Sequence, residues 1–339
     1  MVDKKPIISI IIPMYNVENY IAICLNSIIQ NDLKNVEVII VNDGSTDNSR
    51  TIAERYQAKY SQIRVYDKKN EGVSSARNYG LMKSKGDWVW FIDSDDAINQ
   101  GSLKYIKKEI SDRNNKFDIL VFKYLKFKRN SDVSKINDIK IPNEAKAISK
   151  FQAMKSLLDN NIAAFPWNKI FKKSLFDKIK FPEDRIYTED LSIMYKLYDK
   201  ASSIYFQSAP FYFYRIRNDS LTHNLSTKKI KDAALSHYEM YSFFKENYPT
   251  LAIKLERNTM INVISLFHRL NKEQILLYPD LIEFLTQNIK ITNYDIRYKI
   301  ECLSFKKCYP IFVIIGRIGK ISRKIRKADC KIKLNTFEK

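Results

Sequence analysis

Three aspartates lie within four residues of one another, directly after a short apolar segment. Residues 88–92, Trp-Val-Trp-Phe-Ile, have the length and composition of a buried strand, and Asp93, Asp95 and Asp96 follow them. Carboxylates at the carboxyl end of a buried strand are suited to bind divalent cations and the phosphates that such cations hold. Strand-end capping and turn formation are the alternative, because an Asp-x-Asp sequence arises readily by chance in an aspartate-rich chain.

The segments that would position these aspartates alternate between strand and helix patterns. Continuous apolar, β-branched runs predict strands covered on both faces, and apolar residues at helical spacing predict helices between them. This rhythm predicts an α/β fold with a mainly parallel sheet and right-handed crossovers. The predicted strands are 7–12, 36–41, 63–66 and 87–92, with a final alternating strand at 211–217. The clearest helices are 18–30 and 74–83.

Polar clusters follow three of these strands. Because ligands of an open parallel sheet bind beyond the carboxyl ends of its strands, we expect the clusters to form one site. The sequence has no Gly-x-Gly-x-x-Gly and no Walker-type loop, which disfavours a dinucleotide fold or a phosphate-cradling loop. The clusters are Pro13-Met14-Tyr15-Asn16, Asn42-Asp43-Gly44-Ser45 and Asp93-Ser94-Asp95-Asp96.

Four segments, in this order, resemble family 2 glycosyltransferases of the GT-A fold. The resemblance is close over roughly the first hundred residues and weaker to about residue 220. It implies a Rossmann-like GT-A domain, with helices on both faces of a mainly parallel sheet, that transfers a sugar from a nucleotide diphosphate. The segments are Ser-Ile-Ile-Ile-Pro-Met-Tyr-Asn at 9–16, Val-Asn-Asp-Gly-Ser-Thr-Asp at 41–47, Ser-Ser-Ala-Arg-Asn-Tyr-Gly at 74–80 and Phe-Ile-Asp-Ser-Asp-Asp at 91–96.

The resemblance gives the first two clusters a role in binding the base of a UDP-sugar. Asp43 would accept the uracil imide proton, and Tyr15 and the turn at Pro13 would pack around the base, with Asn16 in the same nucleotide-sugar site. Arg77 would contact the nucleotide and help to neutralise its diphosphate. An arginine on the surface of a helix is the alternative for Arg77.

The resemblance places the last cluster on the ribose and diphosphate side. Asp93 would lie by the ribose, and Asp95 would ligate a Mn²⁺ or Mg²⁺ that bridges the two phosphates. Ser94 and Asp96 complete this part of the nucleotide-sugar site. Asp96 would either support the residues that bind the metal or contact the donor sugar. A divalent cation suits the site, because two phosphates would otherwise face several carboxylates.

Glu189 and Asp190 begin a helix that is predicted to run to about residue 198. Inverting transfer is a single displacement, so one carboxylate must take the acceptor's proton on the far side of the anomeric carbon. The resemblance includes an acidic residue here, and we predict that Asp190 is this base, with Glu189 beside it. The start of a helix favours an ionised carboxylate, and simple helix capping is the alternative.

Trp167 and Asn168 lie between the two acidic sites. With Lys169 they resemble a segment common in the polysaccharide-building branch of the family. An indole packs well against a sugar ring and an amide bonds its hydroxyls, so we expect an acceptor or donor-sugar contact. A buried core tryptophan is the alternative.

The chain changes character after about residue 227, where helical patterns replace strands. We therefore divide it into a nucleotide-sugar and catalytic domain (1–225), a helical extension (226–300) and a basic tail (301–339). The extension would wrap the first domain or form a homo-oligomer contact. Over 311–333 isoleucines and basic residues take opposite helical faces, which is typical of attachment to an anionic membrane surface. A solvated helix packed on the domain is the alternative.

The net charge of +20 requires an anionic partner. Nucleic acid is disfavoured, because the basic residues are dispersed or gathered in the tail and no nucleic-acid module is recognisable. A nucleotidyltransferase is also disfavoured, since 13–16 is unlike the Gly-rich opening loop of that class. No apolar run is long enough to cross a bilayer and the amino terminus lacks signal-peptide features, so we expect a cytoplasmic protein attached peripherally to the inner face of the membrane.

The predicted activity follows from these expectations. We predict a metal-dependent inverting glycosyltransferase that moves a sugar from a UDP-sugar to a glycan or lipid-linked glycan. Its product would belong to a cell-surface polymer such as a capsule, an exopolysaccharide or a lipopolysaccharide.

Overall fold

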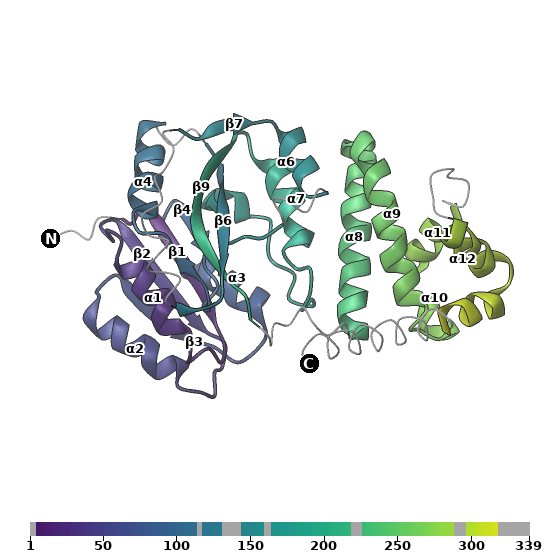
Figure 1. Ribbon diagram of the computed structural model, residues 1–339, viewed down its shortest axis with the longest axis horizontal. Helices are drawn as coiled ribbons and strands as arrows, with labels where there is room; N and C mark the ends of the chain where they lie inside the picture. Colours follow the sequence, from purple (N-terminus) through teal and green to yellow (C-terminus); the bar gives the residue numbers. More distant parts are fainter. Residues whose placement is uncertain are drawn as a thin grey trace, which may run out of the picture. The chain divides into compact units, whose positions relative to one another are not determined.

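The computed structural model describes residues 5–113, 117–130, 144–158, 164–217, 226–287 and 296–317. The chain divides into two compact units, Met1–Asn224 and Leu225–Lys339. The first unit combines a sheet with helices, and the described part of the second is helical (Figure 1).

One nine-stranded sheet forms the first unit, in the order β3-β2-β1-β4-β8-β6-β9-β5, with β7 paired to β9. Within the described residues, β1 to β4, β6 and β9 share one direction, and β5, β7 and β8 run opposite to it. The mainly parallel sheet predicted from the sequence is therefore confirmed. The strands are β1 (Ile8–Met14), β2 (Val36–Asn42), β3 (Ile63–Asp67), β4 (Trp88–Phe91), β5 (Ala97–Ile98), β6 (Ile119–Phe127), β7 (Lys146–Ile148), β8 (Lys169–Lys172) and β9 (Ile204–Arg215).

Helices cover both faces of this sheet (Figure 1). Alternate residues of β1 pack in opposite directions: Ile10 and Ile12 belong to the main core with α1 and α4, whereas Ile11 meets α3 on the other face. At that contact a Cβ added to Gly80 would lie 2.3 Å from Cγ2 of Ile11, so α3 packs close against the strand only because residue 80 is glycine. The helices of this unit are α1 (Ile21–Ile29), α2 (Ser49–Lys59), α3 (Val73–Lys83), α4 (Ser102–Asp112), α6 (Lys150–Ser156), the short 3₁₀ helix η1 (Lys173–Phe176) and α7 (Leu191–Lys200).

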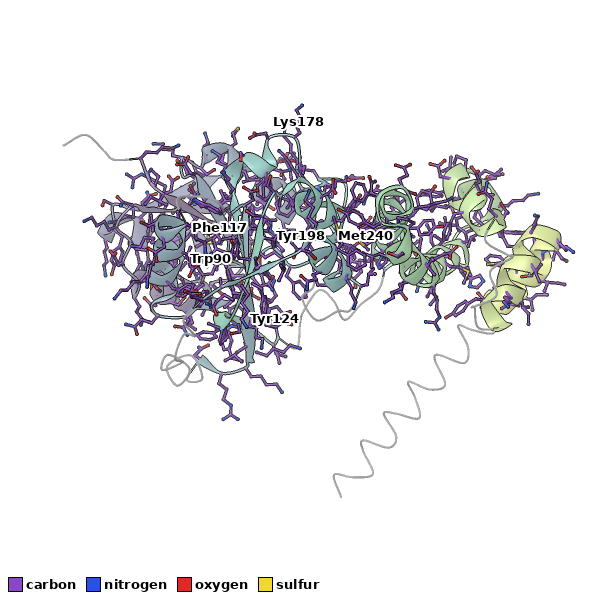
Figure 2. The ribbon with its side chains drawn as sticks, turned by 90° about the horizontal axis from the view of Figure 1, so that it is seen from above. Trp90, Phe117, Tyr124, Lys178, Tyr198 and Met240 are labelled. Carbon is purple, nitrogen blue, oxygen red and sulfur yellow. The ribbon has the colours of Figure 1, made fainter. Side chains whose placement is uncertain are left out.

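Large aromatic side chains fill the interior around β4 and β6 (Figure 2). The ring centroids of Trp88 and Phe117 are 4.4 Å apart, and those of Trp90 and Phe122 are 5.3 Å apart in an edge-to-face arrangement. All four side chains are almost fully buried. This packing holds the end of β4, and therefore the aspartates after it, in a fixed position.

Two element boundaries differ by three residues or more from those predicted. The helix expected from residue 18 begins at Ile21, because Glu18 serves the loop instead: its Oε2 accepts the Asn48 N–H at 3.0 Å, and its own N–H donates to Asp47 at 3.0 Å. The strand expected at 211–217 begins at Ile204, where pairing with β6 extends it.

The second unit contains α8 (Thr227–Asn247), α9 (Pro249–Phe267), α10 (Lys272–Leu276), α11 (Pro279–Gln287) and α12 (Ile296–Lys307), and residues 309–317 are also helical. Tyr248 alone separates α8 from α9, and the two long helices lie side by side (Figure 1). None of the helices that the structure describes is long and apolar enough to cross a membrane. Most of the predicted amphipathic segment, from Ile318 onward, lies outside the described residues.

Candidate active site

The parallel strands end at one edge of the sheet. Met14 of β1 lies opposite Asn42 of β2, which in turn lies opposite Asp67 of β3, so the residues that follow these strands are neighbours. β4 runs beside β1 in the same direction and leads to Asp93 at the same edge. The three polar clusters predicted to form one site therefore follow adjoining strands.

Asp43 binds the loop that leads into α3. Its Oδ1 accepts hydrogen bonds from Lys68 Nζ (2.8 Å) and the Glu71 N–H (3.1 Å), and its Oδ2 accepts one from the Gly72 N–H (2.8 Å). Gly72 has φ +95°, a conformation that favours glycine. Asp43 is 4% exposed and organises this loop, and its contact with the uracil base stays a prediction.

Residues that follow β2 hold the turn after β1. Asn16 has φ +48°, its N–H donates to Ser45 Oγ at 3.1 Å, and its Oδ1 accepts the Thr46 N–H at 2.8 Å. Pro13 is buried at the end of β1, whereas Tyr15 is 48% exposed. An exposed ring on an anchored turn is suited to pack against a planar base, the role predicted for Tyr15.

Arg77 connects the two acidic regions of the site. It lies on α3, 4% exposed, one turn before the close packing at Gly80. One terminal nitrogen donates to Asp93 Oδ1 and the other to Glu189 Oε1, both at 3.0 Å, and the guanidinium lies 5.2 Å from the ring centroid of Phe181. Burial opposes its charge, but Asp93 and Glu189 raise the pKa of Arg77. It is therefore a buried ion-pair residue and not an arginine on the helix surface.

Tyr212 of β9 fixes the turn that contains the aspartates. Its hydroxyl accepts the Asp93 N–H at 3.0 Å and donates to Asp96 Oδ2 at 2.7 Å, while Asp96 Oδ1 accepts the Arg215 N–H at 2.7 Å. Asp96 is 1% exposed, and burial together with Asp95 and Asp93 raises its pKa well above the usual range. Asp96 thus ties the turn to β9, and its predicted contact with the donor stays a prediction.

Asp93 and Asp95 are the more accessible members of the cluster, with side chains 26% and 25% exposed. Asp95 Oδ2 accepts a hydrogen bond from Arg217 at 3.0 Å. Burial and the charge of Asp93 raise the pKa of Asp95, against the effect of Arg217. Two carboxylates that repel each other in this way favour a cation between or beside them. Ser94, between them, is 6% exposed.

Asp190 caps α7, and its Oδ1 accepts the Leu191 N–H at 2.7 Å. Burial, followed by the charge of Glu189, raises the pKa of Asp190 to about 7, while Arg77, the Leu191 N–H and Lys169 oppose the shift. Thr188, two residues earlier, has φ +57°, a strained conformation for a β-branched residue. A partly buried carboxylate with a pKa near neutrality has the properties of a general base.

Trp167 and Asn168 lie inside the domain. The indole is 3% exposed and stacks with Phe165 (centroids 4.6 Å apart) and Tyr212 (4.5 Å), which favours the core role that the sequence left open. The amide of Asn168 donates to the Phe122 carbonyl at 3.3 Å and accepts from Lys169 Nζ at 2.6 Å. A sugar contact of either side chain stays a prediction.

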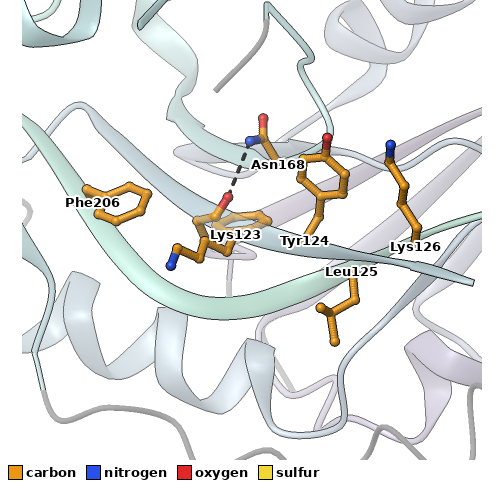
Figure 3. A pocket seen from close by; sticks show the side chains of 7 residues that line it. Lys123, Tyr124, Leu125, Lys126, Asn168 and Phe206 are labelled. Carbon is orange, nitrogen blue, oxygen red and sulfur yellow. Dashed lines mark hydrogen bonds between the residues drawn. The ribbon is translucent and has the colours of Figure 1, made fainter. Parts of the chain in front are cut away.

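Asn168 also lines a pocket of about 460 Å³ (Figure 3). β6 provides most of its wall, at the register shifts around Lys123 where its pairing with β9 is irregular. Neither this pocket nor a second one of about 490 Å³ between α3 and η1 is lined by Asp93, Asp95 or Asp190. The other residues of the first pocket are Phe122, Lys123, Tyr124, Leu125, Lys126 and Phe206.

Three side chains of the candidate site could not be identified from the sequence. The sequence marks Tyr212 only as part of an alternating strand, gives no signal at Lys68, and assigns no role to Lys169 within its motif. The alternation predicts a strand but does not distinguish Tyr212, because Phe211, Tyr212 and Phe213 are all fully buried. Nothing local to Lys68 or Lys169 distinguishes them from other lysines in a chain this basic.

Comparison with known proteins identifies the family of this chain. The model of glycosyl transferase family 2 matches residues 9–180. The putative glycosyltransferase EpsH of Bacillus subtilis is 29% identical over 274 residues, which cover 79% of this chain and 78% of EpsH. The minor teichoic acid biosynthesis protein GgaB of the same organism is 30% identical over 219 residues, 62% of this chain but only 23% of GgaB.

Among solved structures, S. aureus TarS 1-349 in complex with UDP-GlcNAc matches with a TM-score of 0.56 at 23% identity, over 88% of this chain and 79% of that one. The expected GT-A architecture, with a helical C-terminal region, is confirmed. Because the family model spans more than half of the sequence, the chain belongs to glycosyl transferase family 2 and is a glycosyltransferase.

Proposed function

We propose that this glycosyltransferase transfers a sugar from a UDP-sugar, with inversion, to a glycan or lipid-linked glycan of a cell-surface polymer. The observation that carries the proposal is the Arg77 bridge, which joins Asp93 at the nucleotide side to Glu189, the neighbour of Asp190. One buried residue thus links the proposed site for the leaving diphosphate to the turn that carries the candidate base. TarS binds UDP-GlcNAc and GgaB is named for teichoic acid biosynthesis, which supports this donor and this class of product.

Asp190 would act as the general base. Its carboxylate takes the proton from the acceptor hydroxyl while that oxygen forms the new bond to the anomeric carbon. The bond from that carbon to the diphosphate breaks at the same time, and UDP leaves. A base with a pKa of about 7 is matched to this task at neutral pH, because it is substantially ionised yet strong enough to hold the proton.

A divalent cation fits the donor side. Mg²⁺ and Mn²⁺ are bound by one or two carboxylates together with substrate phosphates and water. Asp95 would hold the cation, with Asp93 beside it, and both side chains are about a quarter exposed. The described residues contain no group of three or more His, Cys, Asp or Glu side chains that would hold a metal alone, so the diphosphate would complete its coordination. The cation would supply positive charge to the departing UDP.

The acceptor and the membrane are the remaining parts of the proposal. The pocket along β6 presents Lys123, Tyr124 and Lys126 without a carboxylate among its lining residues, which suits an acceptor that carries negative charge (Figure 3). The basic C-terminal residues would attach the enzyme to the inner face of the membrane, where a lipid-linked acceptor would lie. Truncation after Cys308 should then reduce binding to anionic liposomes, and unchanged binding would remove this part of the proposal.

The activity is tested by measuring UDP release from a panel of UDP-sugars with Mn²⁺, with Mg²⁺ and with EDTA. We expect release from at least one donor that depends on a divalent cation and is lost in Asp190→Asn. Release from GDP-sugars alone would overturn the choice of donor. Metal-independent release would overturn the role of Asp95.

A further inference from the structure

Within the second unit, α12 packs against α9 and α11 (Figure 1). The ring centroids of Phe305 on α12 and Phe267 on α9 are 5.3 Å apart. The helix at 309–317 continues this contact, because the ring centroids of Phe312 and His268 are 4.3 Å apart. One face of α12 and one face of the following helix are therefore turned toward the end of α9.

Two further contacts fix the rotation of these helices. Oε2 of Glu301 on α12 lies 3.8 Å from Nε2 of His268, and both side chains are buried. A Cβ added to Gly316 would lie 2.7 Å from the His268 ring, so the following helix approaches α9 closely because residue 316 is glycine. The residues on the opposite faces are consequently turned away from α9.

These opposite faces expose four large aliphatic side chains. Ile300 and Leu303 of α12 are 50% and 39% exposed, and Ile311 and Ile314 of the following helix are 49% and 53% exposed. The members of each pair are three residues apart, so they are neighbours on one side of a helix. We call the four side chains the aliphatic surface. Exposed apolar groups that lie together mark contact sites for a protein or a membrane.

The exposed charges beside the aliphatic surface are basic. Lys306, Lys307 and Arg317 are exposed. Within 298–317 the chain contains one acidic residue, Glu301, and its side chain is buried. The two helices thus offer aliphatic groups and positive charge to the same partner. Such a combination matches a surface that is apolar inside and negatively charged at its boundary.

We propose that the aliphatic surface docks on an anionic membrane. The aliphatic side chains enter the boundary between headgroups and acyl chains, and the basic side chains lie along the headgroup phosphates. A second copy of the chain fits less well, because a symmetric contact would bring the same basic residues together. The inference rests on the membrane part of the proposed function and deepens it, because it adds insertion of aliphatic side chains from Ile300 onward to the attraction of the basic tail.

The two contributions respond differently to salt. Attraction between lysine and anionic lipid is screened as the ionic strength rises, whereas burial of aliphatic side chains is not. Replacement of either aliphatic pair by serine should raise the lipid concentration for half-maximal binding by about tenfold at any salt concentration. Lys306→Gln combined with Lys307→Gln should have an effect of about that size at low salt and a smaller one at high salt.

The experiment measures co-sedimentation of the full chain with vesicles of equal parts phosphatidylglycerol and phosphatidylcholine, and with vesicles of phosphatidylcholine alone. Ile253→Ser is the matched control, because Ile253 is 65% exposed but lies near the start of α9, at the other end of that helix from Phe267. Its binding should equal that of the wild type. The double variants of the aliphatic surface are Ile300→Ser with Leu303→Ser, and Ile311→Ser with Ile314→Ser.

Wild-type binding by both double variants would refute the aliphatic surface. If truncation after Cys308 still abolishes binding in that case, the basic tail alone attaches the enzyme and only this inference fails. Equal binding to both kinds of vesicle would refute the role of the basic residues. A wild-type dimer, measured by light scattering, that becomes a monomer in the double variants would assign the surface to a second copy and overturn the proposal.

Folding and activity are measured beside vesicle binding. Since all four side chains are exposed, the double variants should keep the melting temperature of the wild type and its UDP release in solution. Weaker vesicle binding with both properties unchanged supports the proposal. Weaker binding that appears only together with a lower melting temperature would count against it, because unfolding of the second unit would then explain the loss.

Discussion

Replacement of Asp190 by asparagine should cost activity and add stability, and the added stability should depend on pH. The carboxyl group prefers its proton in the folded state, because burial and Glu189 raise its pKa from 3.8 to about 7. Between about pH 4 and pH 7 the folded protein therefore binds one more proton than the unfolded chain, and stability falls as the pH rises. Because asparagine does not titrate, the free energy of unfolding of the variant should lack this decrease with rising pH.

The size of the effect follows from the shift. A change of about three pKa units corresponds to a ceiling of about 4 kcal/mol, reached above pH 7 and absent below about pH 4. Asparagine keeps a side-chain oxygen that can accept the Leu191 N–H, so helix capping is retained. Transfer should fall by about 10²- to 10⁴-fold, as expected for the loss of a general base.

Urea unfolding of the wild type and Asp190→Asn at pH 5 and pH 8 tests this prediction, and UDP binding is measured beside it. The free energy of unfolding of Asp190→Asn minus that of the wild type should be larger at pH 8 than at pH 5. Asp32→Asn is the control with the opposite sign: Lys107 lowers the pKa of Asp32, so this change should cost a little stability at neutral pH. A difference for Asp190→Asn that is equal at both pH values would refute the reasoning about its burial.

Three further predictions concern the parts that hold the site together. Gly80→Ala should destabilise the fold by about 1–3 kcal/mol in thermal unfolding, because its methyl group would overlap Ile11, and an unchanged melting temperature would show that α3 can move away. Arg77→Met should lower the free energy of unfolding by about 3 kcal/mol or more and weaken UDP binding, because it leaves Asp93 and Glu189 without their shared cation. Wild-type stability in urea unfolding would count against the Arg77 bridge. Asp95→Asn should raise the Mn²⁺ concentration needed for half-maximal UDP release by at least tenfold, and an unchanged requirement would exclude Asp95 as the ligand.

The strands and helices of the first hundred residues could be predicted from the sequence because their hydrophobic patterns are local. The strands at 7–12 and 36–41 are continuous apolar runs, and only burial on both faces explains such runs. Asp190 was placed at the start of a helix because the apolar period begins directly after it. Errors at the boundaries arose where side chains such as Glu18 bind a distant loop.

The environment of the site could not be predicted, because it depends on contacts across the fold. Arg77 meets Glu189 from 112 residues away in sequence, and the Tyr212 hydroxyl meets the Asp93 N–H from 119 residues away. Whether Trp167 faces a sugar or the core depends on which strand lies over it, and its own neighbours in sequence do not decide this. Burial of the ammonium of Lys169 is likewise a property of the assembled sheet.

The stacking of Trp167 on Tyr212 gives the enzyme a built-in optical reporter. The two rings lie 4.5 Å apart, and the Tyr212 hydroxyl is one hydrogen bond from the backbone of Asp93. Indole emission responds to changes in the charge and packing around the ring. A ligand that engages Asp93 should therefore change the tryptophan fluorescence of the unlabelled protein, and titration with UDP would measure donor affinity before any acceptor is known.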